Sequence, residues 1–272
     1  MVENTSYTGP QRSKAIRSVA LPSEHGGWMF LLEPLLLGLV VAGSWPGLAL
    51  AVAALGAVLL HQPIKVAAKD YLKGKRPLRT VWAERFMALY GLVAVVAFAL
   101  VLRSGERAFL LPLLLALPLM MTQLVYDARN QSRAALPELA GALALAALAP
   151  AIAVLDGWSL ARAWPLWLLV ASRALPAILY VRARLKLDHG KPTQPGVALA
   201  GHIVALVGVA ALALLGHAPW LAVAALLVLL ARAAVGLSRY RRSVRPAILG
   251  MEEIGYGLLT VLVMAVGILY QL

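Results

Sequence analysis

The sequence has no cysteine, so disulfides, thiolate metal sites and cysteine nucleophiles are excluded, and nothing follows about the redox compartment. Charge is also scarce, because charged residues make up 14% of the chain, against about 25% in an average globular protein. Hydrophobic residues make up 61% and the mean hydropathy is +0.81. These values exclude a soluble enzyme of one or two domains and predict a membrane protein.

Apolar runs long enough to cross a bilayer, which takes about 20 residues each, recur along the whole chain between Gly, Pro and charged residues. We expect spans at residues 27–43, 47–68, 82–102, 108–126, 136–155, 163–181, 196–216, 219–237 and 247–270. The runs show no strand-like alternation, so the predicted fold class is all-α, a polytopic bundle of transmembrane helices. Residues 1–20 are expected to form a cytoplasmic tail and residues 21–272 a single transmembrane domain.

The positive charge has a topological explanation. Lys and Arg number 25 against 12 Asp and Glu, a bias that would indicate nucleic acid in a soluble protein. With nine spans and a cytoplasmic N-terminus, 21 of the 25 basic residues face the cytoplasm. Of the other four, Arg173 lies inside a span, and the far side receives only Arg103, Arg107 and Arg162. The positive-inside rule therefore predicts a multi-pass protein of the cytoplasmic (inner) membrane with its C-terminus outside and the lipid bilayer, not nucleic acid, as its partner.

Polar residues within or beside the spans are costly, so they are candidates for function. Nearly all belong to the cytoplasmic half, which predicts a polar cavity open to the cytoplasm. The candidate site residues are Glu24, His25, Glu33, His61, Gln62, Lys65, Lys69, Asp127, Glu138, Arg182, Arg184 and His202. The alternative is that each reaches the headgroups as an interfacial residue. Glu33, His202 and Glu252 lie a turn or more inside the apolar region and Arg173 lies nearer its middle, so these four need partners.

The second span carries a basic face. His61, Lys65, Lys69 and Lys73 are each four residues apart, so they share one side of a helix, where like charges repel. An anion should therefore lie against them: a carboxylate of another span, lipid headgroups or an anionic ligand. The histidines show no metal-ligand spacing, and the chain has no Gly-rich phosphate loop, so no metal and no cofactor are predicted.

Several segments carry a family resemblance. The stretches "PSEHGGW", "LLEPLLLGL", "KRPLR", "ELAGALALA" and "LPAILYVRARLK" resemble the YwiC-like family of bacterial integral membrane proteins from about Leu21 onward. This resemblance implies an architecture and no established activity.

A more distant resemblance is to the UbiA-type intramembrane prenyltransferases. It implies nine spans, a cytoplasmic cavity, and Asp-rich motifs after spans two and six that hold magnesium and the diphosphate of a prenyl donor. At the first motif this chain has His61, Gln62, Lys65 and Lys69 in place of acidic residues. Because a hard cation needs oxygen ligands, the Asp-rich motifs are lost and magnesium-dependent prenyl transfer is disfavoured.

The loss of carboxylates leads to a hypothesis of direct anion binding. Lysine and arginine can bind a headgroup or diphosphate without a metal, which would make Lys65, Lys69, Arg182 and Arg184 ligands of an isoprenoid or other anionic lipid. In a divergent membrane-embedded transferase, Glu24, His25 and Glu33 would be the acid–base candidates. A non-catalytic binder on the same scaffold would need only the basic residues.

Two other classes of function stay open. A small anion or metabolite transporter would line its path with Arg173, Glu33 and His202. A membrane assembly factor or subunit would use its basic loops to dock an acidic partner. The polar residues gather at one end of the spans and the sequence shows no internal repeat, which favours a one-sided cavity over a transport path.

Overall fold

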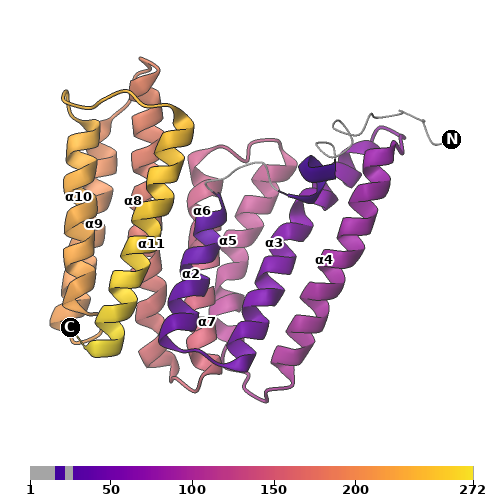
Figure 1. The fold of residues 1–272 in the computed structure, drawn as a ribbon, viewed down its shortest axis with the longest axis horizontal. Helices are drawn as coiled ribbons and strands as arrows, with labels where there is room; N and C mark the ends of the chain where they lie inside the picture. The colour runs from indigo at the N-terminus through magenta and orange to yellow at the C-terminus, as the bar shows by residue number, and fades with distance from the viewer. Residues whose placement is uncertain (1–15, 22–26, 272) are drawn as a thin grey trace. The chain divides into compact units, whose positions relative to one another are not determined.

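The computed structural model describes residues 16–21 and 27–271, and within them the regular secondary structure is helical throughout (Figure 1). The predicted all-α fold class is therefore confirmed. A short helical segment covers residues 16–20. The longer helices are α2 (Gly27–Val41), α3 (Trp45–Tyr71), α4 (Leu78–Leu102), α5 (Leu110–Ala128), α6 (Ala135–Ala146), α7 (Leu148–Leu155), α8 (Leu160–Asp188), α9 (Pro195–Leu214), α10 (Trp220–Leu237) and α11 (Pro246–Tyr270).

Each predicted span corresponds to an apolar helical segment. In the described residues, 8 helical segments are long and apolar enough to cross a membrane, and α6 with α7 counts as one of them, over Ala135–Leu155. The remaining predicted span is α2, whose described part has 15 residues. Helix α8 continues past the predicted end at residue 181 to Asp188, because Arg184 Nε and Asp188 Oδ2, one turn apart, pair at 3.1 Å and stabilise the added turns.

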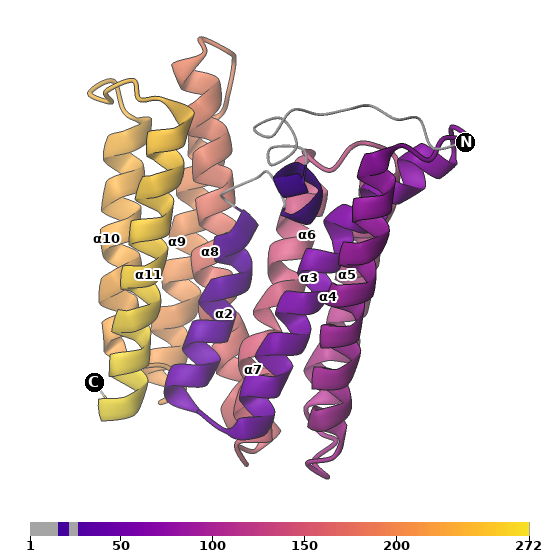
Figure 2. The ribbon, with the colours of Figure 1, turned by 45° about the vertical axis from the view of Figure 1, so that its right-hand side comes forward.

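The described chain divides into two compact units, one with residues 16–21 and 48–105, the other with residues 27–47 and 106–271. In the first unit α3 and α4 run side by side (Figure 2). Gly56 allows their close approach, since a Cβ there would lie 3.1 Å from Ala94 Cβ. The turn between them is fixed by the buried carboxylate of Asp70, which accepts hydrogen bonds from Arg79 Nε at 2.9 Å and Thr80 Oγ1 at 2.7 Å.

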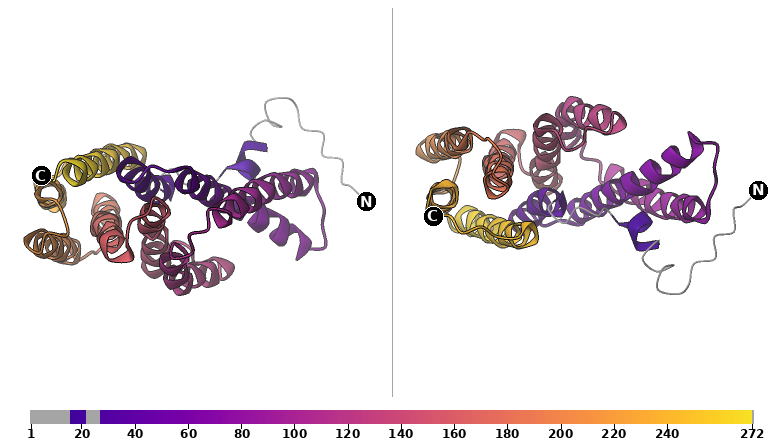
Figure 3. Two further views of the ribbon diagram at one scale, coloured as in Figure 1. Left: turned by 90° about the horizontal axis from the view of Figure 1, so that it is seen from below. Right: turned by 90° about the horizontal axis from the view of Figure 1, so that it is seen from above.

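The second unit is built around α8. Helix α8 contacts α2, α6, α7, α9, α10 and α11. Viewed along the helices in Figure 3, the second unit has two rows of helices. One row consists of α5, the α6–α7 segment, α8 and α9, and the other consists of α2, α11 and α10. The α6–α7 segment is the most buried span, and its many alanines let neighbouring helices pack closely. Trp167 Nε1 also donates to the carbonyl of Leu143 at 2.8 Å, which joins α8 to α6.

Gly236 of α10 provides a test of this packing. A Cβ at this position would lie 2.9 Å from Cε2 and 3.0 Å from Cζ of Tyr180 on α8, whereas a Cβ at the exposed Gly208 of α9 would meet nothing within 4 Å. We therefore expect Gly236→Ala to lower the free energy of unfolding in detergent by about 1–3 kcal/mol, the usual cost of overpacking. Gly208→Ala should be neutral or slightly stabilising, since Ala favours helix. Equal stability of the two variants would contradict the α8–α10 contact.

Candidate functional site

Four charged side chains meet inside the second unit and form what we call the ion-pair chain: Glu33 of α2, Arg173 of α8, Glu253 of α11 and Arg232 of α10. Arg173 Nη1 lies 3.2 Å from Glu33 Oε1, and Arg173 Nη2 lies 3.6 Å from Glu253 Oε2. Arg173 Nη2 also donates to the backbone carbonyl of Glu253 at 2.8 Å. Arg232 pairs with the other carboxylate oxygen of Glu253. The two acids and two bases are formally neutral together, as buried charges require.

Aromatic rings complete the environment of Arg232. Its guanidinium carbon lies 4.4 Å from the ring centroid of Tyr180 and 4.3 Å from that of Tyr256, and such cation–π contacts stabilise a partly desolvated arginine. The ring of His202 meets Tyr180 edge-on at 6.5 Å between centroids. His202 Nδ1 lies 2.8 Å from the carbonyl of Ala198. Because a carbonyl only accepts, Nδ1 is the donor in this contact.

Gly257 leaves the room that the ion-pair chain occupies. It follows Glu253 by one helical turn on α11. A Cβ at Gly257 would lie 2.7 Å from Arg173 Nη2 and would also overlap Glu33 Oε1. The small residue therefore lets the carboxylate and the guanidinium meet against the backbone of α11.

The ion-pair chain is incompletely hydrogen-bonded. In the described part of the chain, the buried atoms with no hydrogen-bond partner include Glu33 Oε1, Glu33 Oε2, Arg173 Nε and Glu253 Oε2. Leaving a buried polar atom unsatisfied costs about 1–3 kcal/mol, and more for a charged group. Each such atom in a native structure calls for an explanation, which makes the ion-pair chain a candidate functional site.

A second feature is a pocket of about 440 Å³ between the end of α8 and the start of α9, here called the α8–α9 pocket. Its lining combines apolar side chains with two cations and two neutral polar residues. The lining residues are Leu179, Arg182, Ala183, Lys186, Pro192, Thr193, Gln194, Val197 and Ala198. Arg182 Nη1 is held at the pocket by Glu138 Oε2 of α6 at 2.6 Å and by the carbonyl of Arg133 at 2.9 Å.

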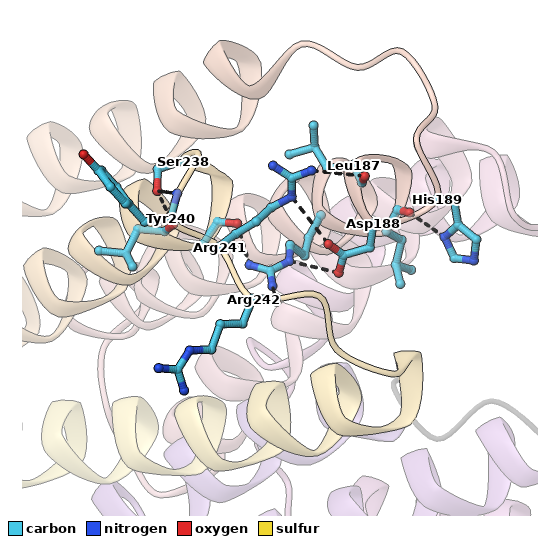
Figure 4. Close-up of polar contacts among 11 residues, drawn as sticks. Leu187, Asp188, His189, Ser238, Tyr240, Arg241 and Arg242 are labelled. Carbon is cyan, nitrogen blue, oxygen red and sulfur yellow. Dashed lines mark hydrogen bonds and ion pairs between the residues drawn. The ribbon is translucent and has the colours of Figure 1, made fainter.

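Arg184 is buried, whereas Arg182 is partly exposed, and Arg184 ties α8 to the connection between α10 and α11. Figure 4 shows this junction, with Asp188 and Leu187 of α8 beside Arg241 of the connection. Besides pairing with Asp188, Arg184 donates from Nη1 to the carbonyl of Gly236 at 2.5 Å and from Nη2 to the carbonyl of Arg242. Arg241 reinforces the same junction, because its Nε lies 3.5 Å from Asp188 Oδ1 and its Nη2 donates to the carbonyl of Leu187 at 3.3 Å. We call this set the Arg184 clamp.

The predicted site residues are distributed over both units. Of the second unit's residues, Glu33 lies in the ion-pair chain, His202 beside Tyr180, Arg182 with Glu138 at the pocket, Arg184 in the clamp, and Asp127 in the last turn of α5. His61, Gln62, Lys65 and Lys69 lie on α3, where both lysines are exposed and Gln62 Nε2 donates to the carbonyl of Ser18 at 3.2 Å. Glu24 and His25 fall outside the described residues.

The carboxylates of the first unit pair with arginines. Asp70 binds Arg79, and Glu84 accepts from Arg76 Nε at 2.9 Å and from the hydroxyl of Tyr71. The Glu84 carboxylate raises the pKa of Arg76, so this guanidinium in the turn stays charged.

Two members of the ion-pair chain were missed as site residues. Glu253 and Arg232 are not among the predicted site residues, and the topology prediction counts Arg232 only as one of the cytoplasmic basic residues. The available signals were the position of Arg232 inside the apolar run 219–237 and the spacing of Glu253 one turn before Gly257. Across residues 16–21 and 27–271, no three or more His, Cys, Asp or Glu side chains are grouped in a way that could hold a metal ion.

The fold and the buried charges define a polytopic α-helical membrane protein. The family model described as YwiC-like protein matches residues 21–153. This match confirms the predicted YwiC-like resemblance over the matched region, which holds α2 to most of α7 and includes Glu33 and Glu138. No curated protein and no solved structure matches the chain. The resemblance to UbiA-type prenyltransferases stays a prediction.

The Arg184 clamp makes a prediction about the connection at residues 238–245. Replacing Arg184 by Gln removes its donors to Arg242 and Gly236, so we expect trypsin to cut after Arg239, Arg241 and Arg242 several-fold faster in Arg184→Gln than in the unmodified protein, because local opening governs cleavage. Lys186→Gln, at an exposed position two residues along, is the matched control and should leave cleavage unchanged. Identical cleavage rates in both variants would show that the clamp does not hold the connection.

Proposed function

We propose that this protein binds an anionic amphiphile, an isoprenoid diphosphate or a lipid with a phosphate headgroup, in the α8–α9 pocket without a bridging metal. The observation that carries the proposal is the composition of the pocket, whose lining holds two cations and no carboxylate beside an apolar wall. Its volume falls within the range of about 300–1,000 Å³ that small-molecule sites occupy.

The two cations suit a phosphate group in different ways. Arg182 and Lys186 are four residues apart on α8, so they project from the same face toward the pocket. A guanidinium offers a planar fork of donors to phosphate oxygens, and an ammonium offers a mobile point charge. Thr193 and Gln194 add neutral hydrogen-bonding groups at the start of α9.

The apolar lining suits a hydrocarbon chain. Leu179 and Ala183 come from α8, and Val197 and Ala198 come from the first turn of α9. These helices are candidate membrane spans, so a ligand with its headgroup at Arg182 and Lys186 would extend its tail along apolar side chains. A soluble anion such as inorganic diphosphate would use the cations and gain nothing from this wall.

Glu138 prepares Arg182 for this role. The Arg182–Glu138 pair is about one-third exposed on both sides, at 30% and 35% of the side-chain surface. A partly exposed pair of this kind contributes little stability, so an incoming phosphate can share the guanidinium at small cost. The pair then serves to hold Arg182 at the rim of the pocket.

The remaining predictions fit the same proposal. We place the pocket on the cytoplasmic side of the inner membrane, because the basic residues flanking α8 belong to the predicted cytoplasmic set. The exposed Lys65 and Lys69 of α3 are proposed to face anionic lipid headgroups. No chemical step is assigned to the pocket, so binding is the function proposed for it.

The test uses farnesyl diphosphate as the probe with the purified full-length protein in detergent, with and without EDTA. We expect binding that survives EDTA, and a loss of about tenfold or more in affinity for Lys186→Gln, since a charge-assisted hydrogen bond contributes about 1.5–3 kcal/mol. The matched control is Lys191→Gln, an exposed lysine of the same connection that does not line the pocket, and it should bind normally.

Further binding measurements identify which kind of anionic ligand the pocket takes. Farnesol and inorganic diphosphate separate the contributions of tail and headgroup, and vesicles with and without phosphatidic acid separate a bilayer lipid from a soluble isoprenoid diphosphate. The proposal fails if no anionic amphiphile binds, if binding requires magnesium, or if Lys186→Gln and Lys191→Gln behave alike.

A further inference from the structure

We infer that Glu33 is a reversible proton-binding site inside the second unit, with Glu253 as the group through which it exchanges protons with the exterior. This inference concerns the ion-pair chain and is independent of the α8–α9 pocket. It assigns proton uptake and release to a carboxyl group on an apolar helix.

The unsatisfied oxygens of Glu33 are the first support. Glu33 is fully buried, with 0% of its surface exposed. Within the described part of the chain, neither Oε1 nor Oε2 of Glu33 accepts a hydrogen bond. Its nearest charge partner, Arg173, is 3.2 Å from Oε1, and Arg173 Nε is itself without a hydrogen-bond partner. A carboxylate held this way is poorly solvated by the protein, so a proton on Oε2 removes a buried charge that the surroundings do not fully stabilise.

The tight packing around Glu33 selects a proton over a larger ligand. A single methyl group at Gly257 would overlap Glu33 Oε1 and lie 2.7 Å from Arg173 Nη2. A metal ion or a small molecule needs more room than this contact leaves, whereas a proton adds no volume. The site is therefore matched to the smallest cation.

Arg173 already has a second partner for the protonated state. Its Nη2 donates to the backbone carbonyl of Glu253 at 2.8 Å and lies 3.6 Å from Glu253 Oε2. When Glu33 takes a proton, Arg173 can move toward Glu253 Oε2, which has no hydrogen-bond partner in the state described. Arg232 keeps its contact with Glu253 Oε1 and its two tyrosine rings. The guanidinium thus has two arrangements that differ by one proton on Glu33.

The other helices that contact α2 add few charges to this balance. Helices α6, α7, α8 and α11 all contact it. Helix α7 has no titratable residue, and the one acidic residue of α6, Glu138, is paired with Arg182. The charged groups facing Glu33 are Arg173 from α8 and Glu253 from α11.

The gradient of burial gives the exchange route. Side-chain exposure rises from 1% at Glu33 and 3% at Arg173 to 12% at both Glu253 and Arg232. Glu253 is therefore the carboxylate closer to solvent. In each cycle the Glu253 carboxylate takes a proton from a hydronium ion, which becomes water. The O–H bond on Glu253 then breaks as an O–H bond forms on Glu33, and the reverse steps return the proton to water. No other bond changes.

The experiment is infrared difference spectroscopy of the full-length protein in lipid across about pH 5 to about pH 9, a window that runs from near the usual carboxyl range to well above it. We expect a carbonyl stretching band of a protonated carboxylic acid that grows as the pH falls, shifts in D2O, and is lost in Glu33→Gln. The matched control, Glu138→Gln, removes a partly exposed carboxylate that pairs with Arg182 and should retain the band.

Two further variants keep the test decisive if Glu33→Gln fails to fold. Gly257→Ala pushes against the Glu33–Arg173 contact and should shift the pH midpoint of the band, whereas Gly250→Ala, whose Cβ meets nothing within 4 Å on the same helix, should not. The inference is overturned if no such band titrates, if Glu33→Gln retains it, if Glu253→Gln rather than Glu33→Gln removes it, or if Gly257→Ala and Gly250→Ala give the same midpoint.

Discussion

The ion-pair chain is the constraint on which the second unit depends. Glu33, Arg173, Glu253 and Arg232 come from α2, α8, α11 and α10, so four helices must be in register before any of these charges has a partner. A buried charge without its partner costs far more than the pair contributes. The main effect of the ion-pair chain is therefore to specify which helices pack together and in what register along their axes, and its contribution to stability is secondary.

Much of the local sequence follows from this constraint. Gly257 lacks a side chain because the Glu33–Arg173 contact occupies that space, and Gly236 lacks one because Tyr180, which faces Arg232, occupies it. The Arg184 clamp, one helical turn beyond Tyr180 on α8, then fixes the connection between the two helices that supply Arg232 and Glu253. Close helix packing and charge pairing are thus two aspects of the same arrangement.

Hydropathy predicted the helices well, because the length and composition of an apolar run report directly on a span. The span predicted at residues 163–181 ends before α8 does, because the Arg184–Asp188 ion pair extends the helix beyond its apolar part. The need of Glu33 and Arg173 for partners was predicted from their depth, but their pairing was not. Glu33 and Arg173 are 140 positions apart in the sequence, and spacing rules reach only along one helix. Arg232 and Glu253 were missed for the same reason, since each looks interfacial when its own span is considered alone.

The most direct test of the account is a double-mutant cycle on Arg173 and Glu33, measured as the free energy of unfolding in detergent at alkaline pH, where the carboxyl group is ionised. Arg173→Gln leaves Glu33 charged and should cost about 3–5 kcal/mol. The double variant Glu33→Gln with Arg173→Gln keeps the Arg232–Glu253 pair and restores neutrality, so it should lose less than Arg173→Gln alone. Additive losses from the two substitutions would show that the charges do not act as a unit, and would contradict the account.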